Sequence, residues 1–238
     1  MSSITIKQAV SEGTSLKFVP LAAELTAKDR RLQDFGGRIL ADRIVQEMGP
    51  RLRNLVDSIQ AGFQGDGAPV VLVTGCRRGA GCTTAALALA LAAAECRSVM
   101  LLEGNWTHPG LAGGLGVVPK PGWTDSLRRG CRYEESLHHL KETQNLAFLA
   151  LGHPVDEPAR ILTDPALGHW QVQFRLKYDL VIVEGGTVEN SGVHWASWSD
   201  VALMVGDAGQ KLLEAWASAW DQLEEAGAQV LGIVETFG

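Results

Sequence analysis

The run Val71-Leu-Val-Thr-Gly-Cys-Arg-Arg-Gly-Ala-Gly-Cys-Thr-Thr84 decides the fold of this 238-residue chain. It begins within Val70–Thr74, an apolar, β-branched run that is typical of a strand buried in a parallel sheet. A glycine-rich loop follows over Gly75–Gly81, and an alanine- and leucine-rich helix is predicted over Thr83–Glu95. Such a loop directs several backbone N–H groups and a helix N-terminus at one point, so the sequence predicts an anion-binding site there.

The loop departs from a nucleotide-binding P-loop at one position. A P-loop places lysine directly after its last glycine, and serine or threonine after the lysine. Here Cys82 stands at the lysine position, and Thr83 stands where a magnesium ligand is expected. The residues predicted to surround an anion or a weakly bound nucleotide are Gly75, Arg77, Arg78, Gly79, Ala80, Gly81, Cys82, Thr83 and Thr84.

Strands and helices are predicted to alternate after this loop. The alternation is typical of the α/β class, with a doubly wound, mostly parallel sheet flanked by helices, as in P-loop NTPases. Any ligand is then expected outside the C-terminal ends of the strands. The predicted strands are Val99–Glu103, Leu146–Ala150, Leu180–Glu184, Val201–Val205 and Val230–Val234, and the predicted helices are Pro158–Leu162, His169–Lys177 and Gln210–Ala226.

The N-terminal part of the chain lacks this alternation. We therefore divide the chain into an N-terminal arm with helices, residues 1–66, and an α/β domain, residues 67–238, which together form one globular unit. Met1–Pro20 has no clear period and is expected to be an arm or extended segment. Thr26–Gln64 carries apolar residues at helical spacing, but Gly49-Pro50 interrupts it. Because proline fits only the first turn of a helix, two helices are expected.

Composition narrows the classes of function. The 21 basic and 27 acidic residues give a net charge of −6, so a nucleic-acid partner is not expected. The longest apolar stretch, Ala85–Ala94, is much shorter than the ~20 residues of a membrane span. Residues 1–20 lack the charged start and apolar block of a signal peptide. The four cysteines form no CxxC pair, which argues against a zinc site or a disulfide framework and favours a reducing cytoplasm.

The motifs resemble those of the bacterial tyrosine kinases of capsule and exopolysaccharide assembly, within the larger group of MinD/ParA-like P-loop ATPases. The resemblance extends from about Glu47 to Gly232 and implies the P-loop ATPase fold, with ATP and magnesium in active members. The family's PGxGKS/T loop is matched by Arg78–Thr84, its LLIDADLRRP strand by Leu101–Pro109, its GxxPPNPxELL segment by Gly152–Leu162, its YDLVIIDTPP strand by Tyr178–Glu184 and its closing LGVVLN by Leu231–Glu235.

The chain departs from this family where the family carries its functional groups. The loop lysine is replaced by Cys82, the two aspartates of the second motif by Glu103 and Asn105, the aspartate of the third by Glu184, and the closing asparagine by Glu235. Phosphoryl transfer depends on positioning and on neutralising charge at the phosphates, and losing one preorganised donor costs on the order of 10²–10³ in rate. These replacements on a retained scaffold predict a pseudokinase, a catalytically inactive regulatory or scaffold protein in exopolysaccharide or capsule synthesis or export.

Two other functions remain open from the sequence. In one, a divergent tyrosine kinase or ATPase uses Arg77 or Arg78 in place of lysine, and Thr83, Glu103 and Glu184 hold magnesium if the metal binds. ATP or ADP with magnesium would then bind weakly; otherwise no cofactor is expected. In the other, the chain is a MinD/ParA-like positioning protein, which needs a membrane-targeting amphipathic segment or a basic face.

For the inactive protein, the resemblance implies a protein partner. The partner would be a membrane-bound component of polysaccharide assembly or an active kinase paralogue. The chain would act in the cytoplasm, recruited by that partner to the inner face of the membrane, with no membrane span of its own. The sequence gives no oligomeric state.

Seven tryptophans are an unusual feature of the composition. Trp106 and Trp123 follow the second motif, and Trp195 and Trp198 follow the third. They are therefore expected either to pack in the core or to lie around the former nucleotide site, where they fill the pocket or form an aromatic binding surface.

Two smaller features carry alternative interpretations. Cys76 and Cys82 are interpreted as small residues in a tight turn, the alternative being a thiol nucleophile or redox pair. The doublet His138-His139 falls in a stretch predicted to be helical and is interpreted as surface rather than as a metal site.

Overall fold

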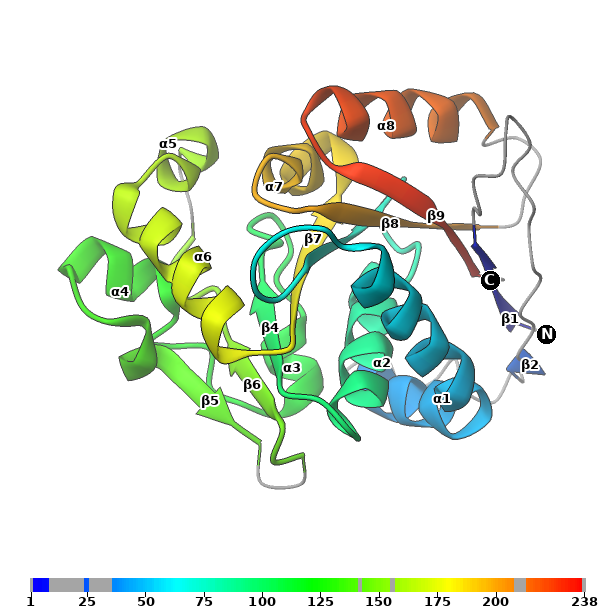
Figure 1. The fold of residues 1–238 in the computed structure, drawn as a ribbon, viewed down its shortest axis with the longest axis horizontal. Coiled ribbons are helices and arrows are strands. Elements are labelled where there is room, and N and C mark those ends of the chain that lie inside the picture. Colours follow the sequence, from blue (N-terminus) through cyan, green and yellow to red (C-terminus); the bar gives the residue numbers. More distant parts are fainter. Residues whose placement is uncertain are drawn as a thin grey trace.

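The computed structural model describes residues 2–8, 24–25, 36–140, 143–154, 157–207 and 213–236. Over these ranges the chain forms three layers, a central sheet with helices on both faces (Figure 1). The α/β class predicted from the sequence is confirmed. Parts of the predictions for the N-terminal arm, its helices and Gln210–Ala226 fall on residues 9–23, 26–35 and 210–212, which lie outside the described residues.

The sheet contains nine strands in the order β2-β1-β9-β8-β3-β7-β4-β6-β5. The strands from β9 to β6 in this order run parallel to one another, whereas β1, β2 and β5 add antiparallel edges. Every strand predicted from the apolar runs is present. Their bounds are β1 (Ser2–Gln8), β2 (Glu24–Leu25), β3 (Val70–Gly75), β4 (Val99–Glu103), β5 (Leu137–His139), β6 (Leu146–Leu149), β7 (Leu180–Thr187), β8 (Val201–Asp207) and β9 (Gln229–Thr236).

The helices include all those predicted in the α/β part of the chain, together with several short ones. The longer α6 begins before the predicted His169 because the Asp164 side chain accepts a hydrogen bond from the N–H of Ala166 at 2.9 Å and caps its first turn. The bounds are α1 (Gly36–Gly62), α2 (Cys82–Ala94), α3 (Leu111–Leu115), α4 (Trp123–Arg129), η2 (Tyr133–Ser136), α5 (Pro158–Leu162), α6 (Pro165–Lys177), η3 (Val188–Gly192), α7 (Val193–Ala196) and α8 (Leu213–Glu225).

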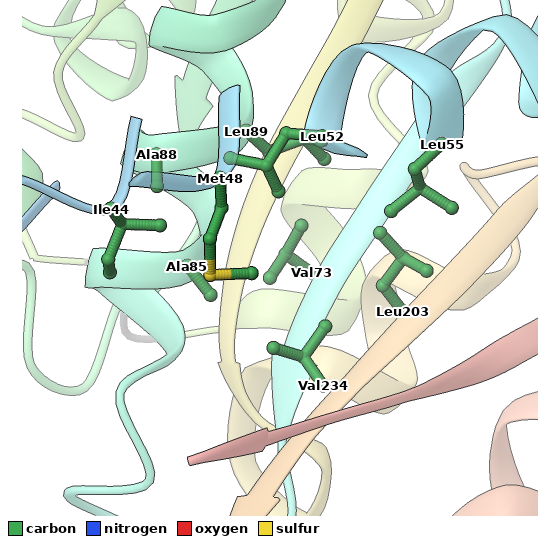
Figure 2. A pocket seen from close by; sticks show the side chains of 10 residues that line it. All are labelled: Ile44, Met48, Leu52, Leu55, Val73, Ala85, Ala88, Leu89, Leu203 and Val234. Carbon is green, nitrogen blue, oxygen red and sulfur yellow. The ribbon is translucent and has the colours of Figure 1, made fainter. Parts of the chain in front are cut away.

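Alternate residues of each parallel strand enter opposite cores, as the pleat of a sheet requires. In β3, Val71 and Val73 join the core that α1 and α2 cover, whereas Val70 and Leu72 join the core that α6 and α8 cover. The first core contains a residual apolar space of about 20 Å³ between α1, α2 and the sheet, and Figure 2 shows the side chains that line it. Such a space holds at most about one water molecule, so we assign it to packing.

The N-terminal helices differ from the expectation. A single helix, α1, runs through Pro50, so the predicted break at Gly49-Pro50 is wrong. Met48 and Leu52 on either side of the proline are buried in the core shared with α2, whereas Pro50 itself is exposed. Packing along α2 (Figure 1) thus holds α1 continuous although the proline removes one main-chain hydrogen bond.

Replacing Pro50 with alanine should therefore stabilise the fold. The substitution restores the N–H that the helix lacks and removes no buried surface, so we expect the free energy of unfolding to rise by about 1–3 kcal/mol in urea titrations. Gln46→Ala, one turn earlier and equally exposed, is the matched control, with an expected change within about 0.5 kcal/mol. A Pro50→Ala protein no more stable than the Gln46→Ala protein would show that the helix is already relaxed around the proline.

The edges of the sheet are the other feature that the sequence did not predict. Ser2–Gln8, within the segment expected as an extended arm, forms β1 and pairs antiparallel with β9. His138-His139, predicted to lie in a helical stretch, forms β5 and pairs with β6, where His138 lies opposite Phe148. A strand of three residues is too short to show a hydrophobic period, so the sequence pattern could not identify β5. In the part of the chain that the structure describes, no helix combines the length and apolarity needed to cross a membrane.

Candidate functional site

The glycine-rich loop joins β3 to α2 and turns through two glycines with positive φ. Gly79 has φ 79°, and Gly81, directly before the helix, has φ 89°. A side chain at Gly81 would be strained in this left-handed conformation. No side chain caps the first turn of α2, so its backbone N–H groups are directed at the space beyond the loop. This is the anion-binding geometry that the glycines predict.

A cavity of about 280 Å³ lies against this loop. It is formed where β3, β7 and β4, which are neighbours in the sheet, end, as expected for a parallel α/β sheet. Of the residues predicted for the site, all of Arg77–Thr83 line it, together with Asn105 and Glu184, while Gly75, Thr84 and Glu103 do not. The full lining is Arg77, Arg78, Gly79, Ala80, Gly81, Cys82, Thr83, Asn105, Thr107, His108, Glu184, Gly186, Thr187 and Asn190.

Cys82 brings no positive charge to the position of the P-loop lysine. Its Sγ donates a hydrogen bond to the carbonyl oxygen of Val73 at 3.1 Å. Burial, reinforced by the nearby carboxylate of Glu184, raises the pKa of the Cys82 thiol well above its usual range. Burial likewise raises the pKa of Cys76 to about 11. Both thiols are therefore neutral at pH 7, and a nucleophile would need the opposite shift.

Glu184 is the acidic group of the cavity. Its side chain is fully buried, and its Oε1 accepts hydrogen bonds from Thr83 Oγ1 at 3.3 Å, Asn105 Nδ2 at 3.5 Å and the N–H of Gly186 at 3.3 Å. Burial, together with the charge of Glu103, raises the pKa of Glu184 to about 7. Among the described residues, its second oxygen, Oε2, has no hydrogen-bond partner although it is buried.

Gly186 allows Glu184 and Asn105 to approach each other. Its φ is +64°, and a Cβ at this position would lie 2.6 Å from Cγ of Asn105. Its carbonyl oxygen also accepts a hydrogen bond from Thr74 Oγ1 at 3.1 Å, at the end of β3. A residue other than glycine here would push Asn105 away from the carboxylate.

Glu103 performs a different task from the one predicted. It is fully buried at the end of β4. Its Oε1 accepts hydrogen bonds from the N–H groups of Leu111 at 2.7 Å and Ala112 at 3.2 Å, and its Oε2 from the N–H of Leu151 at 2.9 Å. Burial raises the pKa of Glu103, and these backbone donors oppose the rise. Glu103 therefore fastens the start of α3 and the segment after β6 to the sheet.

These contacts decide whether the predicted magnesium ligands fit the metal. Thr83, Glu103 and Glu184 were proposed as ligands, but Glu103 is held by three backbone N–H groups away from the cavity, and Thr83 donates to Glu184. Nowhere in the described ranges do three His, Cys, Asp or Glu side chains come together. The three predicted ligands therefore do not form one site: Thr83 and Glu184 line the cavity beside the loop, and Glu103 does not.

The tryptophans next to the site pack in the core beside the second motif, Leu101–Pro109. Trp123, Trp195 and Trp198 are buried, and their rings lie 5.8 Å and 5.3 Å apart in edge contacts. Trp195 Nε1 donates to the carbonyl oxygen of Gly104 at 2.8 Å, and a Cβ on Gly104 would meet that nitrogen at 2.6 Å. Core packing therefore holds for these three rings, while Trp106 is half-buried and tilts against Trp195 at 5.8 Å.

Five residues of the cavity wall are not among those predicted for the site: Thr107, His108, Gly186, Thr187 and Asn190. Each lies at the C-terminal end of a parallel strand or shortly after it. The rule that ligands bind at those ends could therefore have identified these residues from the sequence. Glu235 lies on β9, where its backbone pairs with Thr5 and Gly206; its side chain is outside the described part of the structure.

No protein-family model matches the chain. The chain is 27% identical over 245 residues to the protein named "Putative tyrosine-protein kinase EpsB" of Ralstonia nicotianae, with 97% of this chain and 32% of the relative covered. It is 28% identical over 222 residues to the protein of the same name of Ralstonia solanacearum, with 88% of this chain and 28% of the relative covered. The chain thus spans about a third or less of these relatives' length.

Solved structures give the same fold. The VpsO kinase domain superposes with a TM-score of 0.72 at 20% identity, covering 90% of this chain and 100% of that domain. The kinase domain of Escherichia coli ETK gives 0.68 at 18% identity, covering 79% and 74%. MinD of Pyrococcus horikoshii, solved with Mg-ADP, gives 0.58 at 20% identity, covering 70% and 68%. The resemblance predicted from the sequence is thus confirmed: the chain has the fold of bacterial tyrosine kinase domains and of the wider MinD/ParA-type P-loop ATPases.

Proposed function

We propose that the protein is a catalytically inactive, kinase-like regulatory or scaffold protein that acts through protein contacts in the synthesis or export of an exopolysaccharide or capsule. The observation that carries the proposal is the state of the loop. Cys82 stands where the P-loop lysine would stand, and its neutral thiol donates to the main chain of Val73. The scaffold of the relatives is kept, while this charged group is absent from its expected position.

The acidic positions support the same conclusion. A kinase of this fold needs carboxylates that are free to hold magnesium and orient a nucleophile. Glu103 instead bonds three backbone N–H groups, and Oε1 of Glu184 bonds Thr83, Asn105 and Gly186. A carboxylate held by three backbone N–H groups, as Glu103 is, is not free to bind a metal, and this adds to the loss of the lysine.

One observation favours a second function, a divergent ATP-binding tyrosine kinase or ATPase. Arg77 and Arg78 both line the cavity together with Thr83, and arginine binds phosphate oxygens well. Here the arginines would replace the lysine.

Thermal unfolding with nucleotide separates the two functions. We expect no stabilisation by 5 mM ATP or ADP with magnesium and no phosphate release above that of an Arg77→Ala, Arg78→Ala double variant. A nucleotide at 100 times its Kd would stabilise the protein by about 2.7 kcal/mol, which is readily measured. Magnesium-dependent ATP hydrolysis or tyrosine phosphorylation that the double variant loses would overturn the proposed inactivity and establish the second function.

The partner is proposed from the relatives. Because the similar proteins are named tyrosine-protein kinases and are much longer than this chain, we propose an active kinase paralogue or a membrane-bound component of polysaccharide assembly as the partner. The chain would then act in the cytoplasm, at the inner face of the membrane, held there by the partner.

A further inference from the structure

The outer face of α6 exposes large apolar side chains to solvent. Val172 and Leu176, one turn apart, are 54% and 79% exposed, whereas Leu167, Trp170 and Phe174 bury the inner face of the helix. In the part of the chain that the structure describes, α6 carries two of the four exposed large hydrophobic residues. Exposed apolar side chains that gather on one helix face, rather than lying scattered, indicate an interaction surface.

Gly168 lies on the same face, one turn before Val172. It is exposed, and a Cβ at this position would meet no atom within 4 Å. Glycine is the least favourable residue in a helix after proline, and nothing in the described packing of α6 requires it here. The close approach of a partner to the helix backbone explains a glycine at this position.

The sizes of these three residues suit the packing of α6 on a second copy of itself. When two α6 helices lie antiparallel about a two-fold axis through Val172, the residues four positions before and after it face each other. Leu176 of each copy then packs onto Gly168 of the other, and the contact occurs twice. The antiparallel direction also places the two helix dipoles favourably.

The charged groups on this face are already paired within the chain. The guanidinium of Arg175 donates to both carboxylate oxygens of Asp200, at 2.8 Å and 2.9 Å. The carboxylate of Asp179 accepts hydrogen bonds from the backbone N–H and the hydroxyl of Ser98 at 2.8 Å and 2.7 Å. His169 bonds to a glutamine one turn further on. Two identical faces can therefore meet without bringing unpaired like charges together.

We infer that the outer face of α6 is a homodimer interface, in which two copies of this chain pack antiparallel about Val172. A helix of 13 residues is about 20 Å long, so its face alone buries much less than the roughly 800 Å² per partner of a standard interface. The dimer is therefore weak, with a Kd on the order of 10–100 µM. None of the residues that line the cavity belongs to α6, so the inference does not depend on the proposed function.

Sedimentation equilibrium of the full chain, from about 5 to about 500 µM, tests the inference across the expected Kd. Leu176→Asp should raise the Kd at least about 100-fold, because it places two carboxylates in the apolar contact. Val118→Asp is the matched control: it introduces the same charge at another exposed apolar residue, which is 70% exposed, and should change the Kd by no more than about twofold. Circular dichroism should show that both variants fold, since both side chains are exposed.

An exchange of residues tests the antiparallel register. Gly168→Leu alone should raise the Kd at least about tenfold, because two leucines would then meet where leucine now meets glycine. The double variant Gly168→Leu, Leu176→Gly again sets leucine against glycine across the two-fold axis, and its Kd should return to within about threefold of the wild-type value. Val172→Cys lies at the axis and should form disulfide-linked dimers with copper phenanthroline as oxidant, whereas Val118→Cys should not.

A wild-type chain that stays monomeric at about 500 µM would overturn the inference and would mean that another protein covers α6. A Leu176→Asp protein that dimerises as well as the Val118→Asp protein would place the dimer contact elsewhere and overturn it equally. If the double variant dimerises no better than Gly168→Leu, the antiparallel arrangement about Val172 is wrong.

Discussion

Glu103→Ala should lower the free energy of unfolding by about 3–5 kcal/mol, the largest effect expected of any single substitution in the site. The carboxylate accepts three backbone N–H groups, from Leu111, Ala112 and Leu151, inside the core. Alanine would leave all three without an acceptor, and each buried unsatisfied group costs about 1–3 kcal/mol. Partial access of water to the new cavity keeps the total below the sum.

Urea unfolding of the variant beside Glu189→Ala measures this effect. Glu189 is exposed, so its replacement should change stability by about 0.5 kcal/mol at most. The loss of stability in Glu103→Gln should lie between those of the two alanine variants. The amide oxygen of glutamine can still accept backbone hydrogen bonds, whereas its NH₂ group would face a backbone N–H that is also a donor. A loss under about 1 kcal/mol in Glu103→Ala would show that the three N–H groups find other acceptors, and Glu103 would then be free for another role.

The regular part of the fold could be predicted from the sequence because each signal was local. Val70–Thr74 is buried on both faces of the sheet, and its sequence is accordingly an apolar, β-branched run. The glycines of the loop predict the turn into α2. The antiparallel edges β1 and β5 were not predicted because the pairing of an edge strand depends on the neighbouring strand. In addition, β5 has only three residues, too few to show a period. The break expected at Pro50 failed for a similar reason, since packing on α2 outweighs the local cost of proline.

The site shows the same division between local and distant causes. Glu103 and Glu184 stand where the resembling family has aspartates, and the resemblance therefore predicts both as magnesium ligands. Which of them faces the cavity is decided by backbone donors outside the strand: the N–H groups of Leu111, eight residues on, and of Leu151, 48 residues on, hold Glu103 away from it. Nothing in the residues around Glu103 marks this role. The loop geometry needed only its own glycines, and for that reason it could be predicted.

The two glutamates also influence each other directly. Glu103 on β4 and Glu184 on β7 are paired in register on adjacent strands, and the charge of Glu103 is the second cause, after burial, of the raised pKa of Glu184. Two buried carboxylates so close disfavour a second ionisation. The consequence is a folded state that holds a proton that the unfolded chain releases.

The stability of the protein should therefore fall as pH rises from about 4.5 to about 7. Glu184 has a pKa of about 7 in the folded state against 4.5 for the free side chain. Within that window the folded state binds more protons than the unfolded state, so the contribution is fully present below pH 4.5 and is lost above pH 7. A shift of this size corresponds to about 3 kcal/mol.

Urea unfolding at pH 5 and pH 8 should show the wild-type protein losing about this much more stability than Glu184→Gln, which has no proton to release. Glu103 is present in both proteins, so its own raised pKa largely cancels in the comparison. Parallel losses in the two proteins would mean that Glu184 ionises normally and that its buried oxygen is hydrated.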